Sequence, residues 1–301
     1  MLNPEETFDA CVQALALPAT VIADRETVIE PISRWVAGQC STRPFVLGVA
    51  GAQGSGKSTL CHLLACWLGA RHGLRVAVVS IDDLYRTRSE RNRLAHEVHP
   101  LCAIRGVPGT HDVALGVELF ATLDEALRDS HTRVPRFDKA TDDRLPTHQW
   151  DTFAGRPDVV LFEGWCVGAT VPPVGEEPTN DREARDDPDG TWREWSDAAL
   201  RNDYGALFGR LDAQLMLQVP SMQAVRRGRW RQEKCRWDAA ERTGSVADSP
   251  GLLTIAEVNE YVDLFERLTL HMLATMPERS DVVVTQTEDF QRSLIRLPGV
   301  R

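Results

Sequence analysis

A glycine-rich segment near residue 50 has the residue types and spacing that hold a phosphate group. It matches the pattern G-x-x-x-x-G-K-[ST], and with the next threonine its members are Gly51, Ala52, Gln53, Gly54, Ser55, Gly56, Lys57, Ser58 and Thr59. Glycines let consecutive backbone N–H groups curl around an anion, and the following helix adds partial positive charge. Lys57 can then reach the β- and γ-phosphates of a nucleotide, while the Ser58 hydroxyl ligates Mg²⁺. The alternative, a glycine-rich turn that caps a helix, is weaker because chance rarely produces this pattern.

Two acidic positions stand directly after apolar runs, where a carboxylate can meet a bound phosphate. Asp82 follows the run 75–81, and Glu163 follows the run 159–162. Because ligands of open α/β sheets bind at the carboxyl ends of the strands, both side chains are expected to face the phosphate loop. Asp82 can accept or orient the proton of an attacking hydroxyl, and Glu163 can hold Mg²⁺ directly or through water. The alternatives are an ordinary cap at Asp82 and its neighbour Asp83, and an ordinary strand-end charge at Glu163.

Two polar segments between these positions carry side chains suited to an acceptor. Residues 105–112 are glycine-rich, and residues 135–144 are too charged to belong to a core. Plainer interpretations are a turn with the N-cap of the next helix for the first segment and a solvated loop for the second. A turn followed by an N-cap explains the glycines and one capping residue of the first segment, but it does not explain why Arg105 and His111 are present as well. Both segments therefore remain candidates for substrate binding.

A run of positive charge at residues 226–236 is the last candidate, with five arginines and one lysine. Arginine stabilises the charge that spreads over a transferring phosphoryl group, often from a mobile lid. We assign this role to Arg226, although a solvated helix face would have the same composition. A nucleic-acid patch fits less well, because the net charge of the whole chain is −10.

The apolar pattern predicts the scaffold that must position these groups. An apolar run at 45–50, the glycine-rich turn, a helix to about residue 72 and a second run at 75–81 form a strand–helix–strand unit. Such units imply a parallel sheet with right-handed crossovers. Further strands are expected at 158–162, 212–219 and 281–285, and further helices at 113–127, 224–241 and 254–275. We expect an α/β fold with helices on both faces of a parallel sheet.

The organisation along the chain is one main domain with three appendages. Residues 1–44 are predicted to be a helical N-terminal extension, and residues 45–301 the domain itself. The domain is expected to contain an acidic insertion at about 171–190, interpreted as a surface loop, and a basic lid at about 224–241. Residues 176–189 hold seven acids and two arginines, which is half of the net charge, so the rest of the chain is only mildly acidic.

Composition excludes several classes of protein. The chain has 301 residues, of which 43% are hydrophobic, and it contains no run of 18 apolar residues, so neither disorder nor a membrane-spanning helix is expected. The acidic start does not resemble a signal peptide. Seven cysteines without a C-x-x-C pair favour a reducing compartment, and we expect a cytoplasmic location.

The order of these segments resembles a known family. The phosphate loop, residues 80–85, residues 106–112, residues 137–139 with 143–144, and residues 163–165 are similar to the P-loop small-molecule kinases that include phosphoribulokinase, uridine kinase and pantothenate kinase. The greatest similarity is to the plant- and fungal-type D-glycerate 3-kinases and their bacterial relatives. The resemblance covers about 45–285 and implies a kinase-type P-loop NTPase core. It also implies that Asp82 engages the acceptor hydroxyl, that Glu163 serves the metal and that an arginine-rich lid follows the fourth strand.

These inferences lead to one main hypothesis. The chain is expected to use ATP and Mg²⁺ to phosphorylate a hydroxyl of a small, anionic acceptor. The leading candidate for this acceptor is D-glycerate, whose phosphorylation gives 3-phosphoglycerate. The expected catalytic residues are Lys57, Asp82, Glu163 and Arg226, and the expected metal ligands are Ser58 and Glu163. The expected substrate-binding residues are Asp83, Tyr85, Arg105, His111, Asp112, Asp138, Lys139 and Arg144. The alternatives are a kinase of the same group acting on a nucleoside or a pantothenate-like acid, and a nucleotide-dependent switch or ATPase that binds a protein partner. Neither nucleic acid nor membrane is expected as a partner.

Overall fold

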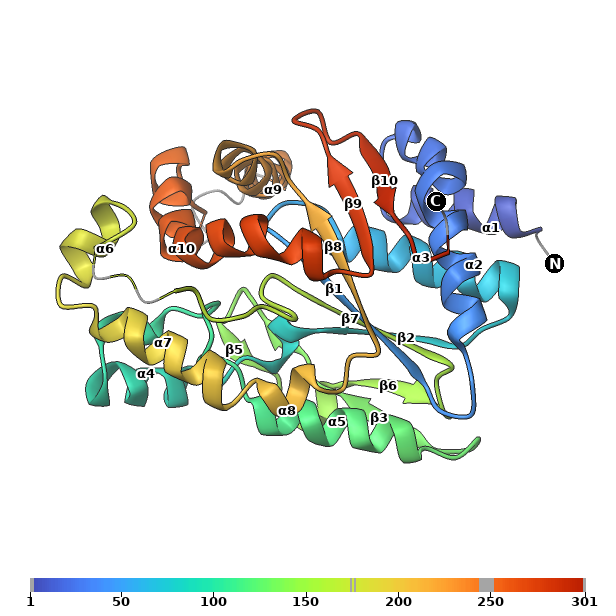
Figure 1. Cartoon of the computed structure of the whole chain (residues 1–301), viewed down its shortest axis with the longest axis horizontal. Helices are drawn as coiled ribbons and strands as arrows, with labels where there is room; N and C mark the ends of the chain where they lie inside the picture. Colours follow the sequence, from blue (N-terminus) through green and yellow to red (C-terminus); the bar gives the residue numbers. More distant parts are fainter. Residues whose placement is uncertain (1–2, 174, 176, 244–251, 300–301) are drawn as a thin grey trace.

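A six-stranded sheet forms the centre of the molecule, and five of its strands are parallel. The computed structural model describes residues 3–173, 175, 177–243 and 252–299, and the strand order is β10-β9-β8-β1-β7-β2 (Figure 1). The strands are β1 (Phe45–Gly51), β2 (Val76–Ser80), β7 (Val159–Gly164), β8 (Ala213–Gln218), β9 (Val282–Gln286) and β10 (Arg292–Arg296). All five expected strands are present, and β10, which was not predicted, pairs antiparallel with β9 at one edge. The α/β fold with a mostly parallel sheet is therefore confirmed.

Helices cover both faces of the sheet, which explains why its central strand is apolar throughout. β1 is buried along its whole length. Val46 and Ala50 join the core beneath α5 (Val113–Glu125) and α10 (Ile255–Arg279), whereas Leu47 and Val49 join the core beneath α3 (Lys57–His72). Because alternate residues of a strand point to opposite faces, a continuous apolar run is what a doubly covered strand requires.

The N-terminal helices share this core. α1 (Pro4–Ala14) and α2 (Glu30–Gln39) lie beside α3, at the end of the molecule that holds the N terminus (Figure 1). The ring of Phe8 meets Trp67 of α3 edge-to-face at 5.6 Å between centroids, and the Trp67 indole N–H donates to Glu30 Oε2 at 2.7 Å. A 3₁₀ turn (Ala19–Ala23) and a π-helical turn (Arg25–Ile29) lie between the two helices.

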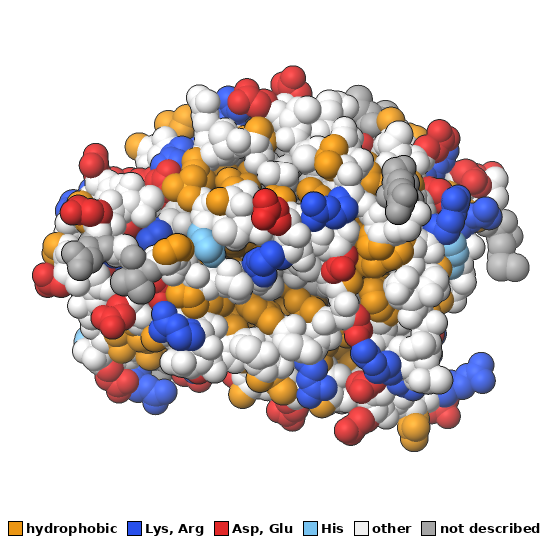
Figure 2. Space-filling model, viewed as in Figure 1, with side chains coloured by type: hydrophobic (Ala, Val, Ile, Leu, Met, Phe, Trp, Pro, Cys, Tyr) orange, Lys and Arg blue, Asp and Glu red, His pale blue; other side chains and the backbone are white. Residues whose placement is uncertain are grey.

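The acidic insertion is more ordered than the loop that the sequence predicted. It contains α6 (Asp181–Asp186), which Asn180 caps through a side-chain bond to the backbone N–H of Glu183. Glu183 and Asp187 are buried against Arg193 of α7 (Thr191–Asn202), with Asp187 Oδ2 3.1 Å from Arg193 Nε. Paired acids of this kind are indistinguishable in sequence from solvated ones. At the α6 end of the molecule, acidic and basic side chains are interspersed (Figure 2). Residues 174 and 176 of this insertion lie outside the described residues.

Two small hairpins between β2 and β7 carry the polar segment 135–144. β3 (His131–Val134) pairs with β6 (Asp151–Ala154), and β4 (Phe137–Asp138) pairs with β5 (Asp143–Arg144). The remaining helices are α4 (Arg88–Glu97), α8 (Gly205–Phe208), α9 (Met222–Thr243) and the 3₁₀ turns Ile81–Leu84, Pro100–Ala103 and Thr147–Gln149. In the described part of the chain, every helix is too short or too polar to cross a bilayer.

Candidate active site

The glycine-rich segment forms a loop that connects β1 to the start of α3. Gly54 and Gly56 have φ values of 73° and 83°, in the left-handed region that favours glycine, and Gly56 is the N-cap of α3. The N–H groups of the first helical turn therefore point toward the loop, with Lys57 and Ser58 as the first two helical residues and Thr59 as the third. This is the geometry that holds a phosphate at a helix N-terminus.

The two strand-end carboxylates reach the same edge of the sheet as this loop. β2 and β7 are neighbours, with Ser80 in register with Glu163, and Asp82 lies in the 3₁₀ turn (Ile81–Leu84) that follows β2. The Ser58 hydroxyl donates to Glu163 Oε1 at 2.8 Å. The topology therefore brings the phosphate loop and the carboxylates together, as expected from the order of the strands.

A cavity of about 520 Å³ opens between these groups, and half of the expected site residues line it. Its lining includes the predicted Gln53, Gly54, Lys57, Ser58, Asp82, Tyr85, Arg105, Asp138, Lys139 and Glu163. It also includes residues to which no role was assigned, namely Ser80, Gly106, Ala140, Trp165, Arg229, Gln232, Arg236 and Tyr261. Arg229 and Arg236 lie in the basic run that the sequence had marked, whereas nothing in the sequence distinguishes Tyr261 from an ordinary core position of α10.

Both oxygens of Asp82 have partners that favour the ionised form. Lys139 Nζ lies 2.7 Å from Oδ2, and the Tyr85 hydroxyl donates to Oδ1 at 2.8 Å. Burial alone would raise the pKa of Asp82, but the charges of Lys139 and Lys57 and these two hydrogen bonds outweigh it and hold the pKa well below its usual range. Asp82 is therefore a carboxylate at neutral pH, as a proton acceptor must be.

Glu163 is the residue best placed to serve a metal ion. Its side chain is buried, and Oε2 has no hydrogen-bond partner in the described structure, although a buried carboxylate oxygen ordinarily has one. The described residues form no group of three or more His, Cys, Asp or Glu that could hold a metal alone. Mg²⁺ beside a nucleotide does not need such a group, because phosphates and water supply most of its ligands. One free carboxylate oxygen and the Ser58 hydroxyl therefore fit a Mg²⁺ bound together with a triphosphate.

Several predicted substrate residues lie behind the cavity wall instead of in it. His111 is 1% exposed, stacks on Tyr85 with 4.7 Å between ring centroids, and its Nδ1 is 2.5 Å from the Tyr204 hydroxyl. Burial lowers the pKa of His111 to about 4, so the ring is neutral. The prediction that His111 contacts the substrate directly is therefore wrong in this geometry. His111 supports the ring of Tyr85 instead.

Three more predicted contacts are ion pairs within the scaffold. Asp112 caps α5 by accepting from the N–H of Leu115, and it holds Arg144 Nη1 at 2.9 Å. Asp83 accepts from Arg136 Nη1 at 2.6 Å and lines a second cavity, of about 460 Å³, which shares Asp82 with the first. These pairs form because the two hairpins pack on the segment after β2, a contact between distant parts of the chain.

The basic run lies in α9, which contacts the phosphate loop and brings arginines to the cavity other than the one expected. Arg226 pairs with Asp263 and Glu266 of α10, outside the cavity lining. The cavity receives Arg229, Gln232 and Arg236 of the same helix instead. Next to them, Gly228 packs so closely that a Cβ there would lie 2.8 Å from the carbonyl oxygen of Gly54.

The loop, the strand-end carboxylates and the arginine-bearing helix together define a P-loop site of the kinase type. A family model described as methylmalonyl Co-A mutase-associated GTPase MeaB matches residues 18–89, which include the loop. The chain is 32% identical over 225 residues to the uncharacterized kinase mug58 of Schizosaccharomyces pombe, covering 69% of this chain and 77% of that protein. It is 33% identical over 132 residues to the chloroplastic D-glycerate 3-kinase of Arabidopsis thaliana, which is 42% of this chain and only 29% of the plant protein.

A solved structure shares the fold over nearly the whole molecule. The D-glycerate 3-kinase of Cryptococcus neoformans superposes with a TM-score of 0.67 at 22% identity, covering 92% of this chain and all of that one. The chain belongs to the family of P-loop kinases that contains D-glycerate 3-kinases, uridine kinases and pantothenate kinases.

Proposed function

We propose that this protein transfers the γ-phosphoryl group of ATP to a hydroxyl of a small anionic acceptor, with D-glycerate as the acceptor and 3-phosphoglycerate as the product. The observation that carries the proposal is that one cavity contains the phosphate loop, the ionised Asp82 and two cationic side chains, Arg105 and Lys139. The first two serve phosphoryl transfer, and the cations suit a carboxylate on the acceptor.

Each part of the cavity has a distinct task in this reaction. The loop amides and Lys57 hold the β- and γ-phosphates. Asp82 takes the proton of the acceptor hydroxyl while the hydroxyl oxygen bonds to the γ-phosphorus and the bond from that phosphorus to ADP breaks. Arg229 and Arg236 neutralise the charge that develops on the transferring group. Ser58 and Glu163 would hold Mg²⁺, which supplies charge neutralisation when it is bound.

A compact acid is favoured over a nucleoside because the aromatic rings of the cavity are already packed. Tyr85 stacks on His111, Trp165 meets Phe265 edge-to-face at 4.8 Å, and Arg229 lies over the ring of Tyr261 at 5.5 Å from its centroid. A nucleoside base needs an open ring face, whereas a hydroxy acid needs only donors and cations. The plant and fungal relatives described as D-glycerate 3-kinases support the same acceptor.

The test is an acceptor panel with purified protein, ATP and Mg²⁺. ADP release is measured with D-glycerate, L-glycerate, uridine, pantothenate and ribulose 5-phosphate, and the product is identified by phosphorus NMR. We expect D-glycerate to give the highest kcat/KM. Stimulation by another acceptor alone would replace glycerate but keep the kinase reaction. Slow hydrolysis that ignores every acceptor would instead favour the switch or ATPase alternative.

A further inference from the structure

The turn between β4 and β5 delivers a lysine to the proton acceptor of the proposed reaction. Lys139 follows β4 directly, and its Nζ lies 2.7 Å from Asp82 Oδ2. The chain contains only three lysines, and the other two are Lys57 of the phosphate loop and Lys234 of α9. Because Tyr85 donates to Oδ1, each oxygen of Asp82 already accepts a hydrogen bond before an acceptor is present.

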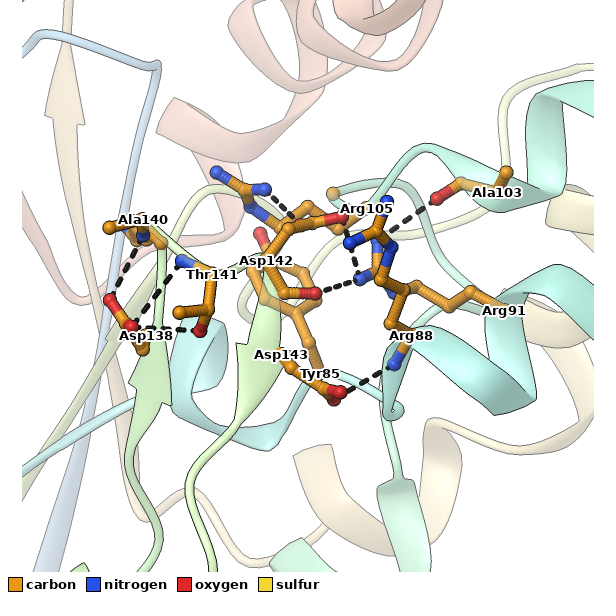
Figure 3. A network of polar contacts seen from close by, with 12 residues as sticks. Tyr85, Arg88, Arg91, Ala103, Arg105, Asp138, Ala140, Thr141, Asp142 and Asp143 are labelled. Atoms are coloured by element: carbon orange, nitrogen blue, oxygen red, sulfur yellow. Dashed lines mark hydrogen bonds and ion pairs between the residues drawn. The ribbon is translucent and has the colours of Figure 1, made fainter. Parts of the chain in front are cut away.

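The turn itself is held in place by Arg91 of the neighbouring helix α4, as Figure 3 shows. Arg91 of α4 is 1% exposed, and it donates to the backbone carbonyls of Ala103 at 2.9 Å and Asp142 at 2.6 Å. Its guanidinium also lies 3.0 Å from the Asp142 carboxylate, and Arg105 pairs with the same carboxylate. The end of the turn next to β5, at Asp142, is therefore anchored on α4 by charge-assisted hydrogen bonds.

The tip of the turn is closed by its own side chains. Asp138 accepts from the backbone N–H of Ala140 at 2.9 Å and from the Thr141 hydroxyl at 2.7 Å. With the backbone fixed at both places, the part that is free to move is the four-carbon side chain of Lys139, which is 61% exposed and borders both cavities. Its ammonium group can leave Asp82 without any rearrangement of the hairpin.

We propose that Lys139 is a gate on Asp82 that makes ATP turnover depend on an anionic acceptor, an inference that rests on the kinase function proposed above. In the absence of the acceptor, the ammonium group is bound to Oδ2 and offsets its negative charge, so a water molecule beside the γ-phosphate meets only a weakened proton acceptor. An acceptor with a carboxylate close to its hydroxyl takes the ammonium group with the carboxylate and places the hydroxyl against the freed Oδ2. The substrate class is therefore a short hydroxy acid, in which one molecule presents both groups.

The gate separates two reactions that share the same bond cleavage. In transfer, the acceptor oxygen bonds to the γ-phosphorus, the bond from that phosphorus to the ADP oxygen breaks, and Asp82 receives the hydroxyl proton. In hydrolysis, water replaces the acceptor, and the products are inorganic phosphate and ADP. A lysine that only bound the acceptor would assist transfer and leave hydrolysis unchanged, whereas a gate suppresses hydrolysis. The two roles thus predict opposite results for its removal.

The experiment compares Lys139→Met, Lys139→Arg and wild type, with Lys234→Met as the matched control. Lys234 pairs with Asp238 at 3.3 Å on the exposed side of α9, and both lysine side chains are 61% exposed. ADP release is measured with Mg²⁺ and ATP alone, and again with increasing D-glycerate. Thermal unfolding of each variant checks that the fold is kept.

We expect Lys139→Met to raise hydrolysis without acceptor about tenfold, a part of the roughly 10²–10⁴-fold that a positioned proton acceptor supplies. The same variant should lower kcat/KM for glycerate about 100-fold, mainly through KM. Lys139→Arg should keep hydrolysis low, and Lys234→Met should match wild type. Unchanged or lower hydrolysis in Lys139→Met, while wild type still responds to glycerate, would overturn the gate. Failure of every acceptor to stimulate wild type would instead refute the proposed function, so the two failures are distinguishable.

Discussion

The contact between α9 and the phosphate loop can be tested with a glycine-to-alanine substitution. Such a substitution usually stabilises a helix, but here we expect it to disturb the contact. Gly228 lies inside α9, where alanine ordinarily stabilises a helix by about 1 kcal/mol relative to glycine. A Cβ at this position would lie 2.8 Å from the carbonyl oxygen of Gly54 and 3.1 Å from its carbonyl carbon. Both are backbone atoms of the loop, so no flexible side chain can move aside. Gly228→Ala is therefore expected to improve the helix and to push it off the loop.

The size of the effect follows from the cost of overpacking. Inserting a methyl group into a close-packed contact costs about 1–3 kcal/mol. The substitution therefore destabilises the state in which α9 contacts the loop. Arg229 and Arg236 enter the cavity in that state, because they belong to the same helix as Gly228. About 1.4 kcal/mol corresponds to a factor of ten, so kcat/KM for ATP should fall about tenfold or more. The free energy of unfolding should stay the same or rise.

The assay is steady-state ADP release at saturating acceptor, together with urea denaturation of each variant. Gly38→Ala is the control, because Gly38 is also helical, in α2, and a Cβ there meets nothing within 4 Å. The control should keep wild-type kinetics. If Gly228→Ala retained a kcat/KM within twofold of Gly38→Ala, the closed contact between lid and loop would have no part in turnover, and the reasoning would be refuted.

Three further substitutions test the site and its support. Asp82→Asn should keep ATP affinity while lowering kcat by about 100-fold or more, and near-normal turnover would show that another group takes the proton. Glu163→Gln should raise the Mg²⁺ concentration for half-maximal turnover by about tenfold, and a metal titration identical to wild type would exclude a role for its free oxygen. Arg91→Met removes the buried guanidinium that holds the carbonyls of Ala103 and Asp142 and should cost about 3 kcal/mol of unfolding free energy in urea. Arg93→Met, an exposed position on the same helix, is its control, and an equal loss in both variants would contradict the anchor.

Structure was predicted correctly from sequence where one short segment contains all the residues that determine it. The phosphate loop is such a case, because the glycines, the lysine and the helix start are consecutive, and backbone sterics then set their arrangement. Asp82 and Glu163 were also placed correctly at the loop, since parallel neighbouring strands bring their carboxyl ends to one edge. The central strand was recognisable because burial on both faces leaves no polar position in it.

The errors concern side chains whose partners lie far along the chain. His111 and Arg226 have the residue types of ligand contacts, but one is buried against Tyr204 and the other pairs with Asp263. Neither pairing has a local signal, because each joins elements that are separated by many residues. The same holds for the acidic insertion, where Arg193 pairs with two buried acids of a segment that composition alone predicted to be a surface loop.

The sequence by itself determined that this chain holds a nucleotide phosphate at the edge of a parallel sheet, because that capacity is encoded in consecutive residues and in the periodicity of single strands. Only the tertiary structure decided which cations enter the cavity. Arg229 and Arg236 reach it because of the direction in which α9 faces, and Lys139 reaches it because the hairpin of β4 and β5 is anchored on Arg91. These depend on packing between distant elements, and the energy of such packing is not a property of any short segment.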